Sequence, residues 1–513
     1  MTTGQNIGRA APWTLLTRLV TLTATVTTSA WIYRGLSEES FGLLSVCRNA
    51  ILLLILICGF GLERTLTRYL PEARTKLGDW AAFALVKRTL LVQLGLMVLG
   101  AGIAIWFGQD FFKLVGAKEN QFNLEPVTWT VVGLTAAMVF FQTISTATIS
   151  EFRTKSVAVA TTLRGVVWIG ATIVVLHVGW QVPAVVLAEA GAFLLGGTWL
   201  WYAAKETHRN DDAPRRHQRF AALSTVVPLR KQLLYSSAVV ADGIVALVVQ
   251  RQSEVFFVAR YHGLEIAGAY DLVYAYPQLA MELIPLAMAP MVTAGFSEMV
   301  AKGQTLHDAM RRYFTLLLVL ALPLATLGFC WADRLLVLLF GPTIEPHAAV
   351  ARAFSLLHAF PLVFIPISTA LFVRDKSPWF LPLGVLSVVV NIGLDVLLIP
   401  PYGLWGAFGA VFCTLTIVSP ITLSLASRML GGLAFPWKKL VKTAAACLFA
   451  LGGLPLRFLL PGTLGLVIGL VVSLGLLAIG FRWLNIIGAE EKQMLAMVKR
   501  KNRTWPEADD TRR

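Results

Sequence analysis

Two arginines, Arg18 and Arg48, lie in stretches of the sequence that are otherwise apolar enough to belong in the hydrocarbon of a membrane. A charged side chain at that depth costs about 2.5 kcal/mol or more, so it usually faces protein, water or a ligand. The guanidinium group is always charged, and its planar set of N–H donors matches two oxygens of a phosphate or a carboxylate. The chemistry that these residues could perform is the binding of an anion.

Other polar side chains recur every three or four residues within the apolar stretches, a spacing that places them on one face of a helix. Four stretches carry such a face: Thr14, Arg18, Thr21, Thr25 and Thr28; Ser236, Gly243 and Gln250, with Asp242 at the edge of the face; Asp271, Tyr274, Gln278 and Glu282; and Gly384, Ser387, Asn391 and Asp395. Lipid cannot satisfy these groups, so they must contact other protein or line a hydrated cavity.

Each of these features also has a purely structural interpretation. Threonine hydroxyls often bond to a carbonyl of their own helix. Arg18 lies about 9 Å from the end of its segment at ~1.5 Å per residue, which is within reach of snorkelling. The acidic residues Asp242, Glu282 and Asp395 could form buried ion pairs between helices, and Asp242 with Arg18 would be one such pair. The residues by themselves leave both interpretations open.

The composition defines the class of protein. Of the 513 residues, 56% are hydrophobic and only 14% are charged, and the mean hydropathy is +0.69. These values are far from those of soluble proteins and predict an all-α, polytopic membrane protein. The 44 Lys and Arg exceed the 29 Asp and Glu by 15, but basic loops on the cytoplasmic side of a membrane explain this excess without nucleic acid.

About fourteen apolar segments are long enough to cross the roughly 30 Å of hydrocarbon. They span approximately residues 13–33, 41–62, 90–107, 127–149, 157–178, 182–204, 233–258, 266–291, 314–331, 348–373, 379–399, 404–425, 443–459 and 464–481. Lys and Arg concentrate in the loops on the side of the N-terminus, which predicts that both termini are cytoplasmic. Every loop is too short for a catalytic domain, and the sequence lacks a phosphate-binding glycine loop and an HExxH motif. We therefore expect no enzyme, no catalytic residue and no metal-binding residue.

The two halves of the chain resemble each other. The stretch from Gly42 to Glu72 has the same length as that from Gly268 to Glu298, and both enclose an apolar segment. Equivalent positions are six segments apart, so the halves have the same orientation, as in a parallel transporter repeat with its binding site between the lobes. We predict an N-lobe at 1–204, a basic cytoplasmic linker at 205–232, a C-lobe at 233–428, helices 13 and 14 at 429–484, and a basic cytoplasmic tail at 485–513.

Several local motifs resemble those of polysaccharide flippases in the multidrug/oligosaccharidyl-lipid/polysaccharide superfamily. The first hairpin carries LSEESFGLLS at 36–45, GFGL at 59–62 and RYLPE at 68–72, and the second half carries NIGLD at 391–395 and IPPYGLWGA at 399–407. The resemblance implies two six-helix lobes around a central cavity that opens alternately to each side. It also implies a substrate that consists of an oligosaccharide linked to a polyprenyl diphosphate.

The resemblance assigns roles to the polar residues. In the lipid II flippase branch, arginines of the first two helices line the cavity, and Arg18 and Arg48 match them by helix and depth. The residues expected to bind the diphosphate and the sugars are Arg18, Arg48, Arg164, Thr21, Thr25, Tyr274, Gln278 and Asn391. Those expected to bind a coupling ion or to form a gate between the lobes are Asp242, Glu282 and Asp395. No cofactor is expected, and transport would be coupled to H⁺, to Na⁺ or to the membrane potential.

The predicted function is the transfer of a lipid-linked O-antigen, exopolysaccharide or related repeat unit from the cytoplasmic to the outer leaflet of a bacterial inner membrane. The partners would be the lipid-linked oligosaccharide, membrane lipids, and the glycan polymerase and glycosyltransferases of the same pathway. One alternative is a drug/cation antiporter of the same superfamily, which needs acidic cavity residues. Another is a membrane-embedded glycan polymerase or ligase, although such enzymes usually have a large external loop with arginines and histidines.

Overall fold

The computed structural model describes residues 3–118, 122–151, 153–207, 223–250, 253–301, 303–374, 381–460 and 462–486, and within them the regular structure is entirely helical. The α-helices in these ranges are α1 (Thr3–Gly35), α2 (Glu38–Gly59), α3 (Leu62–Leu77), α4 (Asp79–Leu114), α5 (Leu124–Ser150), α6 (Thr154–His177), α7 (Val182–Thr207), α9 (Leu229–Gln250), α10 (Glu254–His262), α11 (Leu264–Ala301), α12 (His307–Phe340), α13 (Glu345–Leu357), α14 (Phe364–Val373), α15 (Leu381–Leu430), α16 (Trp437–Ala450), α17 (Leu456–Leu459) and α18 (Gly462–Trp483).

The prediction of an all-α, polytopic membrane protein is confirmed. Ten helices or helix runs among the described residues are long and apolar enough to cross a membrane. Each of the fourteen predicted segments overlaps a helix. The boundary between the segments at 379–399 and 404–425 falls inside α15, where Gly403 leaves the helical conformation with φ 56° and ψ −128°, after Pro400 and Pro401, which each remove one helical N–H donor.

Helix α2 shows how local sequence sets the ends of a helix. Ser37 precedes it, and its side-chain oxygen accepts a hydrogen bond from the backbone N–H of Ser40. Glu38 and Glu39 follow in the first turn, where negative charge is favourable. The helix ends at Gly59 because the next two residues, Phe60 and Gly61, have positive φ values of 50° and 58°.

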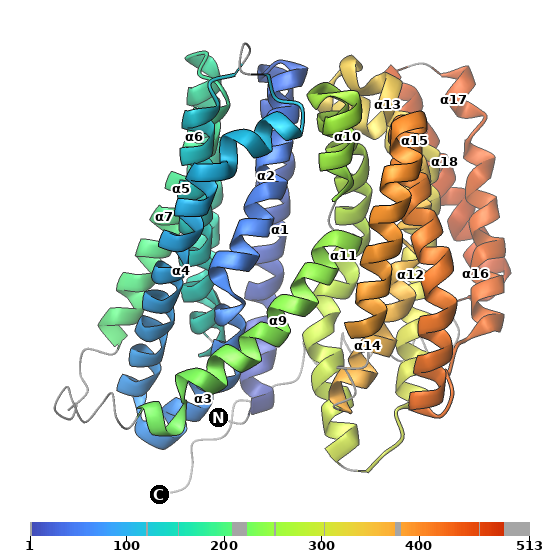
Figure 1. Cartoon of the computed structure of the whole chain (residues 1–513). Coiled ribbons are helices and arrows are strands. Elements are labelled where there is room, and N and C mark those ends of the chain that lie inside the picture. The colour runs from blue at the N-terminus through green and yellow to red at the C-terminus, as the bar shows by residue number, and fades with distance from the viewer. Residues whose placement is uncertain are drawn as a thin grey trace, which may run out of the picture. The chain divides into compact units, whose positions relative to one another are not determined.

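The chain forms two compact units. Unit 1 comprises Met1–Leu279, Leu339–Val350 and Lys376–Leu425, and unit 2 comprises Ala280–Leu338, Ala351–Asp375 and Ala426–Arg513. The lobe boundaries proposed from the repeat remain a prediction. In unit 1, helices α1, α2, α4, α5, α6 and α7 stand side by side, with contacts between α1 and α6 and among α5, α6 and α7 (Figure 1).

The amphipathic helix α3 connects two of the long helices of unit 1 and contacts α4, α5 and α9. Its apolar face, including Leu66 and Tyr69, packs against α4 and against Leu223 and Val227, which lie just before α9. On its exposed side, Lys76 donates a hydrogen bond to Glu72 at 2.7 Å and thereby holds the pKa of that carboxyl below its ordinary value. The segment that leads into α9 is thus anchored on α3 and α4.

A close approach of two glycines positions α2 against α11 within unit 1. A Cβ atom built on Gly42 would lie 1.8 Å from the backbone oxygen of Leu264, and one on Gly268 would lie 3.0 Å from the Cα of Gly42. Only glycine fits at Gly42 without moving backbone. These are the two glycines that occupy equivalent positions in the sequence repeat, and their contact decides which side chains one turn further along face each other.

Candidate functional site

The central feature of the site is an ion pair between α2 and α7. The Arg48 Nη2 atom lies 3.3 Å from Glu189 Oε2, and the two side chains are 22% and 12% exposed. Glu189 was absent from the sequence prediction, although it is the sole acidic residue of the apolar segment 182–204. An isolated acid in such a segment is the signal that could have found it, because a charge at that depth needs a partner.

A second arginine lies beside this pair. Arg164 of α6 is buried, with its guanidinium carbon 4.3 Å from the ring centre of Phe193 and 5.5 Å from that of Phe141. Glu189 acts electrostatically on it, so this carboxylate lies in the field of both guanidinium groups. Cationic groups over aromatic faces are stabilised by the ring quadrupole, which holds Arg164 in place.

The neighbourhood of these arginines contains donors without acceptors. Neither Arg164 Nε nor the indole Nε1 of Trp168, whose ring lies 5.8 Å from the Arg48 guanidinium carbon, has a hydrogen-bond partner among the described residues. Buried donors are normally paired, so exceptions mark a place that an acceptor oxygen would satisfy. Trp168 was noted in the sequence only as part of the repeat, not as a site residue.

Helix α11 brings a second carboxylate to the same place. Because Gly42 and Gly268 touch, Asp271 lies one turn beyond the contact and faces Ser45 and Asn49 of α2, within the field of Arg48. We call Arg48, Arg164, Trp168, Glu189 and Asp271 the arginine cluster. Its two positive and two negative side chains come from four helices of unit 1.

The remaining predicted residues of the first helix lie on α1, whose Ala24 packs against Trp168 of this cluster. Arg18 is exposed on α1 and forms no ion pair with another described residue. Thr21 is partly buried, and its hydroxyl donates to the carbonyl oxygen of Thr17 at 2.8 Å. Thr25 is partly buried as well, and its carbonyl accepts from the Thr28 hydroxyl at 3.4 Å. The threonine face of α1 therefore bonds to its own helix.

A second polar cluster of unit 1 is acidic. Glu254 of α10 is buried and accepts a hydrogen bond from Asn391 Nδ2 of α15 at 3.3 Å, and Ser253 donates to Asn391 Oδ1 at 3.4 Å. Asp395, one turn along α15, is completely buried and lies in the field of Glu254. Neither oxygen of Asp395 nor Oε2 of Glu254 has a partner among the described residues. We call Glu254, Asn391 and Asp395 the acidic cluster.

Two carboxyl groups buried together without a counter-charge are too costly to remain ionised unless a proton or cation balances them. No group of three or more His, Cys, Asp or Glu side chains suited to a metal gathers in the described part of the chain. The acidic cluster therefore suits a proton or a singly charged cation with carboxyl, amide and hydroxyl oxygens. Glu254 was missed in the sequence, although it lies four residues after Gln250 within the apolar segment predicted at 233–258.

The structure places the other predicted residues as follows. Tyr274 is buried on α11, with its ring centre 5.6 Å from that of Tyr270, and Gln278 and Glu282 of the same helix are partly buried. Glu282 lies in unit 2, not in unit 1. The side chain of Asp242, and with it the predicted pair with Arg18, lies outside what the structure describes.

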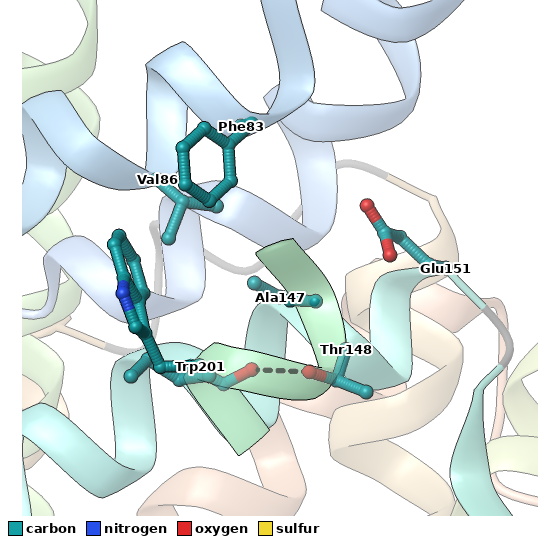
Figure 2. Close-up of a pocket in the computed structure, with 8 residues that line it drawn as sticks. Phe83, Val86, Ala147, Thr148, Glu151 and Trp201 are labelled. Atoms are coloured by element: carbon teal, nitrogen blue, oxygen red, sulfur yellow. Dashed lines mark hydrogen bonds between the residues drawn. The ribbon is translucent and has the colours of Figure 1, made fainter. Parts of the chain in front are cut away.

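A small cavity in unit 1 is too narrow for a substrate. It is lined by Phe83, Val86, Ile144, Ala147, Thr148, Glu151, Trp201 and Ala204, and most of these side chains are apolar (Figure 2). Its volume of about 20 Å³ admits roughly one water molecule. An oligosaccharide or a diphosphate does not fit there.

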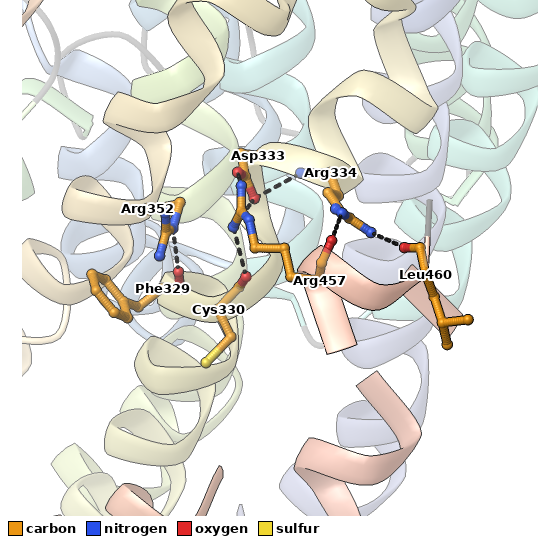
Figure 3. A network of polar contacts seen from close by, with 7 residues as sticks. All are labelled: Phe329, Cys330, Asp333, Arg334, Arg352, Arg457 and Leu460. Atoms are coloured by element: carbon orange, nitrogen blue, oxygen red, sulfur yellow. Dashed lines mark hydrogen bonds and ion pairs between the residues drawn. The ribbon is translucent and has the colours of Figure 1, made fainter. Parts of the chain in front are cut away.

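Unit 2 contains a polar network with a structural role. Arg457 of α17 forms an ion pair with Asp333 of α12, and Arg334 donates to the carbonyl of Arg457 (Figure 3). Arg352 donates from Nε to the carbonyl of Phe329 at 2.7 Å. Arginines that cap carbonyls and share one carboxylate fasten helices to one another. This network ties α17 to α12 and offers no unpaired carboxylate.

Comparison with solved structures defines the class of protein. The fold matches a lipid II flippase MurJ in an inward closed conformation, with a TM-score of 0.69 and 12% identity over 93% of this chain and 99% of that one. It also matches an inward-facing multidrug resistance MATE family transporter of the MOP superfamily, with a TM-score of 0.62 and 15% identity over 80% of this chain and 94% of that one. The chain therefore shares the fold of these two transporters.

Comparison with families identifies the chain further. The family described as polysaccharide biosynthesis protein matches residues 7–296, more than half of the chain. The chain belongs to this family. No curated protein sequence matches it.

Proposed function

We propose that this protein moves a polyprenyl-diphosphate-linked oligosaccharide, such as an O-antigen or exopolysaccharide repeat unit, from the cytoplasmic to the outer leaflet of a bacterial inner membrane. The observation that carries the proposal is the arginine cluster: Arg48 is partly exposed on α2, a helix long and apolar enough to cross a membrane, and Arg164 lies in the field of its partner Glu189. Support comes from the membership of the polysaccharide biosynthesis protein family and from the shared fold with a lipid II flippase.

The chemistry of the substrate suits this cluster. A diphosphate carries about two negative charges, and an arginine fork holds two of its oxygens through charge-assisted hydrogen bonds. Trp168 Nε1 and Arg164 Nε are further donors without a partner in the described structure. Tyr274 and Gln278 offer hydrogen bonds to sugar hydroxyls, and the lipid tail stays in the bilayer while the head group crosses.

The acidic cluster supplies the coupling in this proposal. Binding of H⁺ or Na⁺ between Glu254 and Asp395 neutralises two buried carboxyl groups, and this favours one conformation of the transporter over the other. The membrane potential adds about 2.3 kcal/mol per charge and per 100 mV. Cation entry and substrate transfer are then linked through the conformation of the helices α10, α11 and α15.

The arrangement in the membrane follows from the loops. We propose cytoplasmic N- and C-termini, because Lys and Arg concentrate on that side. The two repeated lobes at 1–204 and 233–428 would rock about the substrate, with the linker at 205–232 between them and the helices at 429–484 beside the lipid tail. Glycan polymerases and glycosyltransferases of the same pathway would be the functional partners.

The test is transport by arginine variants in proteoliposomes, measured as leaflet-resolved accessibility of a polyprenyl-diphosphate sugar. Arg48→Ala should lower the rate about 10- to 100-fold, since a hydrogen bond to a charged group contributes about 1.5–3 kcal/mol. Arg18→Ala tests whether the exposed arginine of α1 contributes to transport. The control is Arg311→Ala, because Arg311 is exposed at the start of α12.

The amount of membrane-inserted protein is measured for every variant. Wild-type rates in both Arg18→Ala and Arg48→Ala would overturn the assignment. Glycan lengthening without movement between leaflets would identify a polymerase instead.

A second candidate is a drug/cation antiporter, and the unpaired carboxyl groups of Glu254 and Asp395 favour it. Such a protein binds organic cations at buried acids rather than phosphates at arginines. Saturable binding of a lipophilic cation that disappears in Asp395→Asn, together with unchanged transport in Arg48→Ala, would favour this candidate.

A further inference from the structure

The charges of the arginine cluster balance before any substrate is present. Arg48 and Arg164 contribute two positive charges, and Glu189 and Asp271 contribute two negative charges. An unpaired guanidinium group at this depth would be costly, so the carboxylates stabilise the substrate-free protein. The same balance is an obstacle to an anionic ligand, because the positive charge is already neutralised.

A diphosphate cannot simply be added to this arrangement. Two like charges about 4 Å apart repel each other by roughly 4 kcal/mol at an effective dielectric constant of about 20. The Arg48 fork would be shared between a phosphate oxygen and the Glu189 carboxylate, which lies 3.3 Å away. One anion, a carboxylate or a phosphate, must therefore give up its hydrogen bonds to the Arg48 guanidinium when the other binds.

The contacts of the two carboxylates identify the one that moves. Asp271 lies beside Ser45 and Asn49 of α2 and acts on Arg48 through its field, whereas the carboxylate that forms the ion pair with Arg48 in the described structure is that of Glu189. Among the described residues, Glu189 accepts its side-chain hydrogen bond from Arg48, and other staggered rotamers of its side chain point away from Arg48. Arg164 is fixed by the rings of Phe141 and Phe193, so it remains in position during the exchange.

We infer that Glu189 is an internal counter-ion that occupies, on Arg48, the place of one phosphate of the substrate, so that the lipid diphosphate binds by displacing this carboxylate. The inference rests on the proposed function. Displacement lowers the apparent affinity, because only the fraction of molecules with a free Arg48 can bind. It also gives a means of release, since Glu189 returns to Arg48 when the lipid leaves.

The experiment measures the binding of farnesyl diphosphate to the full-length protein in lipid nanodiscs, with farnesol as the uncharged control ligand. Glu189→Gln keeps the shape of the side chain and removes the charge. If Glu189 holds Arg48 about nine-tenths of the time, this variant should bind farnesyl diphosphate about tenfold more tightly. Arg48→Ala should bind more weakly, and the double variant should bind no more tightly than Arg48→Ala, because both residues act through one contact.

Glu125→Gln is the matched control, since Glu125 is exposed in the first turn of α5 and its removal changes the net charge equally. Glu189→Asp retains the charge on a shorter side chain, and a smaller gain in affinity is expected. This variant replaces Glu189→Gln in the test if the latter fails to insert in the membrane.

The outcomes separate the inference from the proposed function. Weaker binding in Arg48→Ala without tighter binding in Glu189→Gln overturns the role of Glu189 only. Equal tightening in Glu125→Gln, or tightening that persists without Arg48, shows a general effect of charge and overturns it as well. If the wild-type protein binds farnesyl diphosphate no better than farnesol, the proposed role of Arg48 fails.

Discussion

The two polar clusters of unit 1 differ in how their charges are balanced. In the arginine cluster, Arg48 and Glu189 form an ion pair across two helices, and each charge has a counter-charge nearby. In the acidic cluster, Glu254 and Asp395 lie together with three carboxyl oxygens that lack a described partner. A paired cluster can exchange one anion for another, whereas an unpaired acidic one requires a cation. In the proposed function, this difference assigns substrate binding to the arginine cluster and coupling to the acidic cluster.

The two clusters also differ in how the helices position them. The arginine cluster depends on the contact of α2 with α11 at Gly42 and Gly268. The acidic cluster depends on α10 and α15, where His262 Nε2 lies 2.8 Å from the carbonyl oxygen of Ile399. A change at the glycine contact should therefore affect the arginine cluster first.

Of the substitutions that test the difference between the two clusters, Gly42→Ala is expected to have the largest effect on binding and stability. The added Cβ would lie 1.8 Å from a backbone oxygen, so α2 and α11 must separate, and overpacking of this kind costs about 1–3 kcal/mol or more. Binding of farnesyl diphosphate should be lost, and thermal unfolding in nanodiscs should occur at a lower temperature. Intrinsic tryptophan fluorescence reports the unfolding.

Gly170→Ala is the control for this substitution. Gly170 lies on α6 of the same unit, and a Cβ there meets no atom within 4 Å. Its stability and binding should equal those of the wild-type protein. Normal binding in Gly42→Ala would show that the arginine cluster does not depend on the close approach of these two helices.

Asp395→Asn is expected to have the next largest effect, and it is confined to the acidic cluster. A cation that binds only the folded protein raises its stability by about 1.4 kcal/mol at ten times its Kd. The wild-type protein should thus unfold at a higher temperature with NaCl than with choline chloride, or at lower pH, and Asp395→Asn should show neither effect. Binding of farnesyl diphosphate should remain.

The control is Asp110→Asn, because Asp110 is exposed near the end of α4, 3.9 Å from Lys113. It should retain the cation dependence of the wild-type protein. If Asp395→Asn retained both the sodium and the pH effect, the acidic cluster would not be the coupling site.

Much of the fold could be predicted from the sequence because apolar length and loop charge are strong signals in membrane proteins. All fourteen predicted segments overlap helices, and the break between two of them coincides with Gly403. The repeat pointed to Gly42 and Gly268 as equivalent glycines. It could not show that they touch, because the pairing of helices depends on the shapes of both surfaces.

The candidate site was predicted less completely than the fold, and the residues that the sequence analysis missed were missed for the same reason. The sequence analysis named Arg48, Arg164, Asn391 and Asp395 because each lies in an apolar segment. It overlooked Glu189 and Glu254, although the same argument applies to them. A charge within a span implies a partner of opposite charge or a cation. Sequence spacing shows which residues share one helical face, but it does not show which faces of different helices meet.

A substitution on the threonine face of α1 is expected to have the smallest effect on transport. It tests whether a third region of unit 1 contributes to substrate binding. The Thr21 hydroxyl already donates to Thr17 at 2.8 Å, so Thr21→Val removes a bond within the helix and keeps the volume. Stability should change by less than about 0.5 kcal/mol, as for substitutions away from special features. Transport and farnesyl diphosphate binding should stay within about twofold of wild type, because the hydroxyl is engaged by its own helix. A loss as large as that of Arg48→Ala would mean that the Thr21 side chain contacts the substrate, and the substrate site would then include α1.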